Sequence, residues 1–139
     1  MKLFVDTSVW SLALRRDSPP SVPEVACLST ALEGGNEIYT TGLVLQELLQ
    51  GFQGAKDRDR IVEAFASFPL WLPAREDHVA AADLRSACRR RGIQIETIDA
   101  LLAQLCLRHG LTMLTTDDDF RHVATVRPLT VWGVGQPPS

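Results

Sequence analysis

The chain has 139 residues, of which 45% are hydrophobic and 22% are charged, and its formal net charge is −3. This length predicts one domain with a substantial core. The charge excludes a general attraction to nucleic acid, so any such contact must come from a local patch or a metal ion. No apolar run approaches the roughly 20 residues that span a bilayer, and Asp6 interrupts the first apolar segment, which is not typical of a signal peptide.

The cysteines give a further indication of the compartment. Cys27, Cys88 and Cys106 are odd in number, far apart and without a C-x-x-C pair. This favours small buried thiols in a reducing compartment over disulfides or a zinc site. We therefore expect a cytoplasmic protein that makes no contact with a membrane.

Short apolar runs alternate along the chain with segments of helical periodicity. The predicted strands are 3–5, 37–41, 70–73, 112–116 and 129–133, and the predicted helices are 6–14, 21–34, 43–52, 57–68, 78–91 and 98–109. This alternation predicts an α/β domain with a mostly parallel sheet. We expect the domain to occupy residues 1–134 and to leave residues 135–139 as a short tail.

The helix ends carry signals of their own. Asp6, Thr7 or Ser8 can cap the first helix, and the later helices have Ser21, Asp77 and Thr97 as predicted caps. Two glycines, Gly92 and Gly110, are placed to end helices in the left-handed conformation.

Acidic residues occupy the positions where such a fold binds ligands. Asp6 and Asp117 come directly after predicted strands, and the carboxyl ends of parallel strands meet at one edge of a sheet. Glu47 and Asp99 lie on helices that pack beside those strands. Clustered carboxylates without a nearby lysine raise one another's pKa, and hard oxygen ligands suit Mg²⁺ or Mn²⁺. Because Mg²⁺ usually binds substrate phosphates as well, the pattern indicates phosphoryl or phosphodiester chemistry.

Each acid by itself also has a purely structural interpretation. Asp6 could cap a helix, Glu47 could face solvent, and Asp99 could stabilise the positive end of a helix dipole. Asp119 could cap the short turn that follows it. The functional interpretation therefore depends on the combination and not on any single position.

Four motifs, in order and spacing, resemble those of PIN-domain ribonucleases: "FVDTSVW" (4–10), "TTGLVLQELLQG" (40–51), "TIDALLAQLCLRHG" (97–110) and "LTTDDDF" (114–120). The short length and the last motif are similar to the VapC-type toxins of bacterial toxin–antitoxin pairs. The resemblance covers nearly the whole chain. It implies a three-layer α/β fold with a five-stranded parallel sheet flanked by helices.

The resemblance also implies roles for individual residues. The catalytic acids are expected to be Asp6, Glu47, Asp99 and Asp117, with the metal held by Asp6, Asp99 and Asp117. Thr115 and Asp119 match positions that support the site, Asp119 at its rim or as a cap, and Asp118 is expected to face solvent. Arg15 and Arg16 are candidate RNA contacts, because a planar guanidinium binds phosphate in a bidentate manner.

The activity implied is that of an Mg²⁺-dependent endoribonuclease toxin, with Mn²⁺ as an alternative cofactor. Its partners would be an RNA substrate, a cognate antitoxin protein and a second copy of the chain in a homodimer. The loop at 15–23 and the helix at 57–68 are candidate partner surfaces.

Three other interpretations fit less well. A receiver domain needs a lysine after a late strand, whereas the only lysines are Lys2 and Lys56. A haloacid-dehalogenase-like phosphatase needs D-x-D after its first strand, where this chain has Ser8 in place of the second acid. A PIN domain that binds RNA or protein without cutting remains the alternative function.

Overall fold

A parallel sheet forms the centre of the fold, with β1 (Lys2–Val5) in the middle of the strand order β2-β1-β3. The computed structural model describes residues 1–15 and 22–133. The remaining elements are α1 (Thr7–Ala13), α2 (Pro23–Gly34), β2 (Glu37–Tyr39), α3 (Gly42–Gly51), α4 (Ala55–Phe65), α5 (Arg75–Arg90), α6 (Thr97–His109), β3 (Thr112–Leu114) and α7 (Asp118–Val123). Arg16, Ser21 and the tail 135–139 lie outside the described residues. The predicted α/β fold with a parallel sheet flanked by helices is confirmed.

The two outer strands that the resemblance implied are reduced to single parallel bridges. Thr40 pairs with Leu70 beyond β2, and Met113 pairs with Val131 beyond β3. Prolines 69, 73 and 128 flank these segments, and a proline has no N–H to donate to a ladder, so pairing at the edges stays short. Five parallel segments therefore lie side by side, of which three are regular strands in the described part of the chain.

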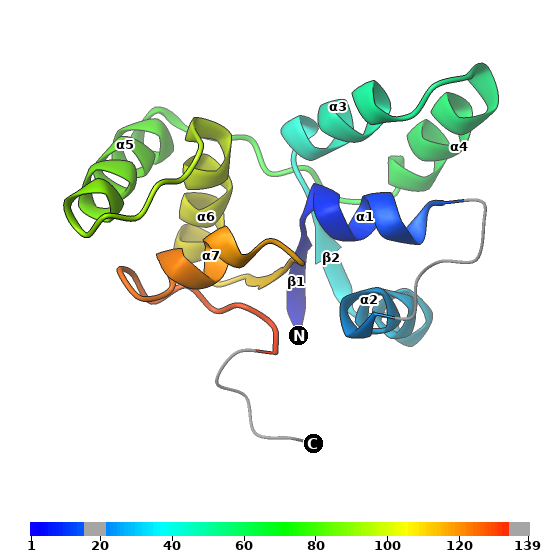
Figure 1. The fold of residues 1–139 in the computed structure, drawn as a ribbon. Helices are drawn as coiled ribbons and strands as arrows, with labels where there is room; N and C mark the ends of the chain where they lie inside the picture. Colours follow the sequence, from blue (N-terminus) through cyan, green and yellow to red (C-terminus); the bar gives the residue numbers. More distant parts are fainter. Residues whose placement is uncertain (16–21, 134–139) are drawn as a thin grey trace.

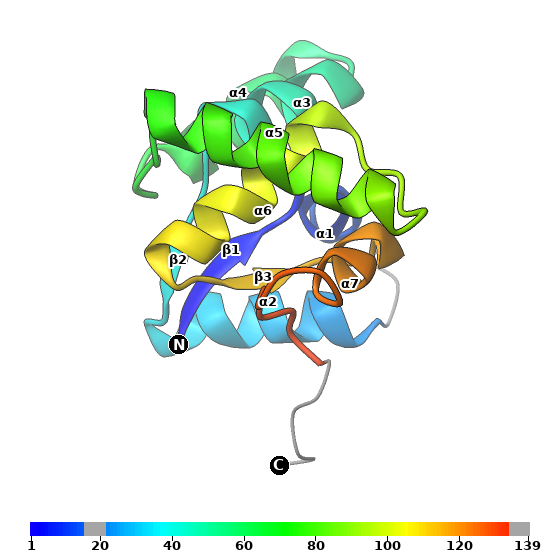
Figure 2. The ribbon, with the colours of Figure 1, turned by 90° about the vertical axis from the view of Figure 1, so that its left-hand side faces the viewer.

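The helices form two groups, one on each side of β1 (Figure 1). Helices α5, α6 and α7 pack together, and α1 packs against α2 and α3, with α4 beside α3. In the second view, α2 lies below the strands and α6 lies above them (Figure 2). The side chains of Leu3, Phe4 and Val5 are fully buried between these layers, which explains why β1 reads as a continuous apolar run.

Two of the predicted N-caps are displaced from their expected positions. Helix α5 begins at Arg75, and Asp77 is its third residue. From this position the Asp77 carboxylate accepts a hydrogen bond from the N–H of Ala74 at 2.8 Å. Helix α6 begins at Thr97 itself, after Glu96 in the cap position. Asp77 acts from the third position, where an acid can accept the N–H of the cap residue and interact with the helix dipole. The prediction for Thr97 was wrong by one residue, which is the usual uncertainty of a helix boundary.

The other helix ends test the remaining predictions. Asp6 occupies the cap position of α1 but its side chain makes no capping hydrogen bond. Gly92 and Gly110 follow α5 and α6 with φ of 76° and 65°, as predicted for left-handed C-terminal residues.

The thiols of Cys88 and Cys106 are buried and that of Cys27 is half-buried, and none forms a disulfide. Within the described ranges, no helix combines the length and apolar character that crossing a membrane requires.

An ion pair between a buried carboxylate and a partly exposed arginine holds α5 against α6. The Asp77 side chain is 1% exposed, and its Oδ2 accepts a hydrogen bond from Nη1 of Arg108 at 2.5 Å in addition to the N–H of Ala74. Since α6 also carries Asp99, this pair helps to fix the helix on which one of the candidate catalytic acids lies.

Replacing this buried acid should destabilise the fold. We expect Asp77→Ala to lower the free energy of unfolding by about 1–3 kcal/mol, because the N–H of Ala74 and the guanidinium of Arg108 both lose their acceptor. Glu76→Ala is the matched control, since Glu76 is an exposed acid in the same turn. Urea titration followed by circular dichroism measures both, and equal effects of the two substitutions would contradict the prediction.

Candidate metal centre

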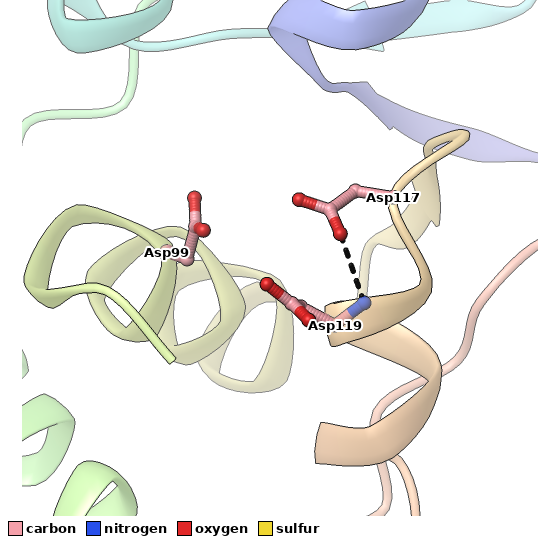
Figure 3. Close-up of side chains that lie close together, drawn as sticks. All are labelled: Asp99, Asp117 and Asp119. Atoms are coloured by element: carbon pink, nitrogen blue, oxygen red, sulfur yellow. Dashed lines mark hydrogen bonds between the residues drawn. The ribbon is translucent and has the colours of Figure 1, made fainter. Parts of the chain in front are cut away.

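Three aspartates from two elements meet beside the carboxyl edge of the sheet. Asp99 lies in the first turn of α6, Asp117 precedes α7, and Asp119 lies in the first turn of α7. One carboxylate oxygen from each lies within 4.8 Å of the other two, and all three side chains are half-buried. Figure 3 shows the three carboxylates pointing toward a common space. This spacing is compatible with a shared divalent cation.

Asp6 organises the loop that carries Asp117. Its Oδ2 accepts hydrogen bonds from the hydroxyls of Ser8 and Thr115, each at 2.9 Å. The same hydroxyls accept backbone N–H groups, Ser8 from Thr116 at 3.1 Å and Thr115 from Asp117 at 2.9 Å. Since the N–H of Asp6 also donates to the carbonyl of Leu114 in β3, the end of β1 and the loop after β3 are joined at several points.

Glu47 approaches the site from the other group of helices. It lies on the exposed side of α3. Partial burial, and then the negative charge of Asp6, raise its pKa above the ordinary glutamate value. Glu47 is therefore electrostatically part of the site, although it stands outside the group of three aspartates.

Burial and the repulsion among the acids act together on Asp99. Burial first, and then the charges of Asp6, Asp117, Glu47 and Asp119, raise the pKa of Asp99 to about 7. Burial is also the main cause that raises the pKa of Asp6, with the hydroxyls of Ser8 and Thr115 opposing it. At neutral pH a substantial fraction of Asp99 is thus protonated when no cation is bound.

The donor set fits a divalent cation. Five acids make up the site: Asp6, Glu47, Asp99, Asp117 and Asp119. Among the described residues, no lysine or arginine forms an ion pair with any of them, and the ion pairs that do occur there use other carboxylates. A cluster of carboxylates without a cationic side chain is what a hard cation such as Mg²⁺ or Mn²⁺ requires. Asp99, Asp117 and Asp119 are the residues that could hold it.

The structure revises several details predicted from the sequence. Asp117 caps α7 by accepting the N–H of Asp119 at 2.9 Å, so Asp119 is not the cap. Asp119 instead joins the close group of acids, in which Asp6, a predicted ligand, is not included. Asp118 is exposed and pairs with Arg121, as expected for a residue facing solvent.

Two further positions complete the comparison with the sequence. Ser8 was expected only as a possible helix cap and not as part of the site, although its hydroxyl lies two residues after Asp6, a spacing that allows it to donate to an aspartate. Arg15 is exposed at the end of α1, and its predicted RNA contact stays a prediction.

The fold and this arrangement of acids define a class of protein. The sequence profile of the PIN domain family matches residues 3–126, which is most of the chain. The chain therefore belongs to the PIN domain family.

Relatives and solved structures agree with this assignment. The chain is 29% identical to ribonuclease VapC23 of Mycobacterium tuberculosis, over 73% of this chain and 95% of the relative. It is also 29% identical to VapC ribonuclease Mb1587 of Mycobacterium bovis, over 91% of this chain and 95% of the relative. Its fold is similar to FitAcB from Neisseria gonorrhoeae, with a TM-score of 0.69 and 23% identity over 96% and 97% of the two chains. It is similar as well to VapBC-5 of Mycobacterium tuberculosis, a toxin–antitoxin system, with a TM-score of 0.65 and 18% identity over 94% and 96%.

The raised pKa of Asp99 predicts how stability depends on pH in the metal-free protein. Between about 3.8 and about 7 the folded state keeps a proton that the unfolded state releases, so the free energy of unfolding should fall as pH rises through this window. Asp99→Asn removes the contribution of Asp99 to this dependence and leaves those of Asp6 and Glu47, whose pKa values are also raised. At pH 8 in EDTA we expect the variant to be more stable than the parent by on the order of 1–2 kcal/mol, after allowance for partial exposure.

Chemical unfolding at several pH values measures this difference. Asp83→Asn, which replaces an exposed acid on α5, is the control and should follow the parent protein. If the parent and Asp99→Asn showed the same pH profile, the repulsion among the acids would be weaker than described.

Proposed function

We propose that this protein is an Mg²⁺-dependent endoribonuclease, with Mn²⁺ as a substitute, that acts as the toxin of a toxin–antitoxin pair. The observation that carries the proposal is the meeting of Asp99, Asp117 and Asp119 within 4.8 Å, with no cationic side chain paired to them in the described residues. Membership of the PIN domain family and similarity to proteins named as VapC ribonucleases support it. We take residues 1–134 as the catalytic unit.

The three close aspartates are proposed to hold the cation. When bound, a divalent cation supplies an acidified water and a counter-charge for the phosphoryl group under attack. The predicted role of Asp6 as a direct ligand stays a prediction. Its Oδ2 accepts hydrogen bonds from the hydroxyls of Ser8 and Thr115. Asp6 acts in any case by holding the loop that positions Asp117.

Glu47 is proposed as the group that takes a proton from the attacking water. Its raised pKa makes it a better base near neutral pH than an ordinary glutamate. In the reaction the water oxygen bonds to phosphorus, the bond from phosphorus to the 3′ oxygen breaks, and the leaving 3′ oxygen takes a proton from solvent. The products are a 5′-phosphate and a 3′-hydroxyl.

The proposed partners are an antitoxin protein and a second copy of the chain. The similarity of its fold to VapBC-5, a member of a family of toxin–antitoxin systems, supports the first. The homodimer rests on the sequence resemblance alone. We also propose a cytoplasmic location, which the proposed RNA substrate and the three free thiols support.

Neighbouring aspartates offer a matched test of the activity. We expect the purified protein to cleave single-stranded RNA in Mg²⁺ and not in EDTA. Asp117→Asn should reduce the cleavage rate by at least about a hundredfold, because it removes charge where the transition state needs the cation. Asp118→Asn, which changes the exposed neighbour, should cleave at nearly the parental rate.

The cleavage assay also tests the alternative function. Gel analysis of the products, with DNA of the same sequence as a second substrate, measures the rates and the specificity. RNA binding without cleavage by the unsubstituted protein would identify a binding module instead of a nuclease.

The ligand set is tested by metal affinity. We expect Asp119→Asn to weaken Mn²⁺ binding by at least about tenfold in isothermal titration calorimetry, whereas Asp118→Asn leaves it unchanged. If Asp119→Asn bound Mn²⁺ as tightly as the parent protein did, Asp119 would belong to the rim of the site and not to the ligand set.

A further inference from the structure

A largely apolar hollow lies next to the acidic centre, between the start of α3 and the helices α5 and α6. Its volume is about 390 Å³, which is within the range of roughly 300–1,000 Å³ that is typical of small-molecule sites. Leu43, Ala82, Ile98 and Leu101 contribute to its apolar walls. The proposed nuclease mechanism uses none of these residues.

The hollow is connected to the acids through two helices. Leu43 lies four residues before Glu47 on α3, so the two side chains share a face and are separated by about 6 Å along the helix axis. On α6, Ile98 immediately precedes Asp99. A molecule held by the acids through one group could therefore place a neighbouring group in the hollow.

Two arginines of α5 line the hollow and are not neutralised. Arg85 donates from its Nε to the carbonyl of Ile95 at 2.9 Å, which fixes its side chain. Neither Arg85 nor Arg89 forms an ion pair with a carboxylate in the described part of the chain. Both also line an adjoining polar hollow with Glu96. Two cations beside an apolar space, next to an acidic centre, match a ligand that is both anionic and partly apolar.

We propose that this hollow, lined by Leu43, Ala82, Ile98 and Leu101 and bordered by Arg85 and Arg89, is a nucleotide subsite for single-stranded RNA. It receives an unstacked base next to the bond that is cut, while Arg85 and Arg89 contact the phosphate of that nucleotide. The inference rests on the proposed nuclease function and names how the same site holds its substrate. Unstacked bases of single-stranded RNA are bound against apolar surfaces and guanidinium planes, and phosphates are bound by arginine forks.

The charge of the hollow favours RNA over a second copy of the chain. A symmetric contact between two copies would place the same surface of each copy against the other. Arg85 and Arg89 would then face a surface that carries the same two arginines, against which Glu96 is the one acid that lines the adjoining hollow. An RNA strand brings one phosphate for each base and so supplies both the apolar and the anionic parts.

The experiment measures binding of a short fluorescent single-stranded RNA of randomised sequence by anisotropy, in EDTA so that no cleavage occurs. Arg89→Ala should weaken binding by about three- to tenfold and reduce the slope of log K against log salt by about 0.7, the effect of one lost phosphate contact. Arg90→Ala removes the same charge from the next position of α5, which does not line the hollow, and should have a smaller effect on both quantities.

A second substitution tests the apolar part. Ala82→Trp fills the hollow without a change in charge, and we expect it to weaken RNA binding by about five- to tenfold through the loss of base contacts. Val79→Trp, at a position of α5 that is 59% exposed and does not line the hollow, is the control. Thermal melting establishes that all variants are folded.

The outcomes separate this inference from the proposed function. Loss of affinity in Arg89→Ala and Ala82→Trp but not in their controls supports the subsite, whether or not the protein cleaves RNA in the parallel Mg²⁺ assay. Absence of RNA binding by the unsubstituted protein, or equal affinities of each variant and its control, overturns it. If Ala82→Trp instead dissociates a dimer in light scattering and leaves RNA affinity unchanged, the hollow is a contact between copies and the proposal is wrong.

Discussion

The hydrogen bonds to Oδ2 of Asp6 are the interaction on which the geometry of the acidic centre depends. A buried carboxylate is unstable unless donors surround it, and here the hydroxyls of Ser8 and Thr115 supply them. Each hydroxyl in turn accepts an N–H from the loop after β3. The requirement to solvate one acid at the end of β1 therefore determines where Asp117, at the end of β3, is placed.

The resulting closeness of the acids creates a conflict between stability and function. Asp99 acquires a pKa of about 7 because it is partly buried among four other carboxyl groups. A sequence selected for stability alone would place a cation or an amide among them. The absence of such a partner in the described residues is consistent with a site that is completed by a divalent cation, since functional sites are where proteins depart from the most stable choice.

The division of the helices into two groups gives the site its surroundings. Helix α3 brings Glu47 and Leu43 from one group, and α6 brings Asp99 and Ile98 from the other. The acidic centre and the apolar hollow therefore lie at the same boundary and share both walls. Although the chain as a whole is negative, this boundary combines carboxylates that suit a cation with arginines that suit phosphate.

Much of this protein follows from the sequence by itself. The alternation of apolar runs and helical segments determined the α/β class, since strand and helix periodicities are local properties. The rule that ligands bind at the carboxyl ends of parallel strands placed Asp6 and Asp117 at one edge. Gly92 and Gly110 ended their helices as predicted, because a left-handed conformation depends on the residue itself.

Only the tertiary structure decided the rest. The sequence could not show that Asp119 joins Asp99 and Asp117, nor that Asp6 and Ser8 hold the loop after β3, because these contacts depend on angstrom-scale placement of residues from about 20 to 109 positions apart. The same limit applied to the outer strands, where prolines reduced the pairing to single bridges. Contacts across the chain depend on how whole helices and strands pack, whereas patterns within one segment depend only on neighbouring residues.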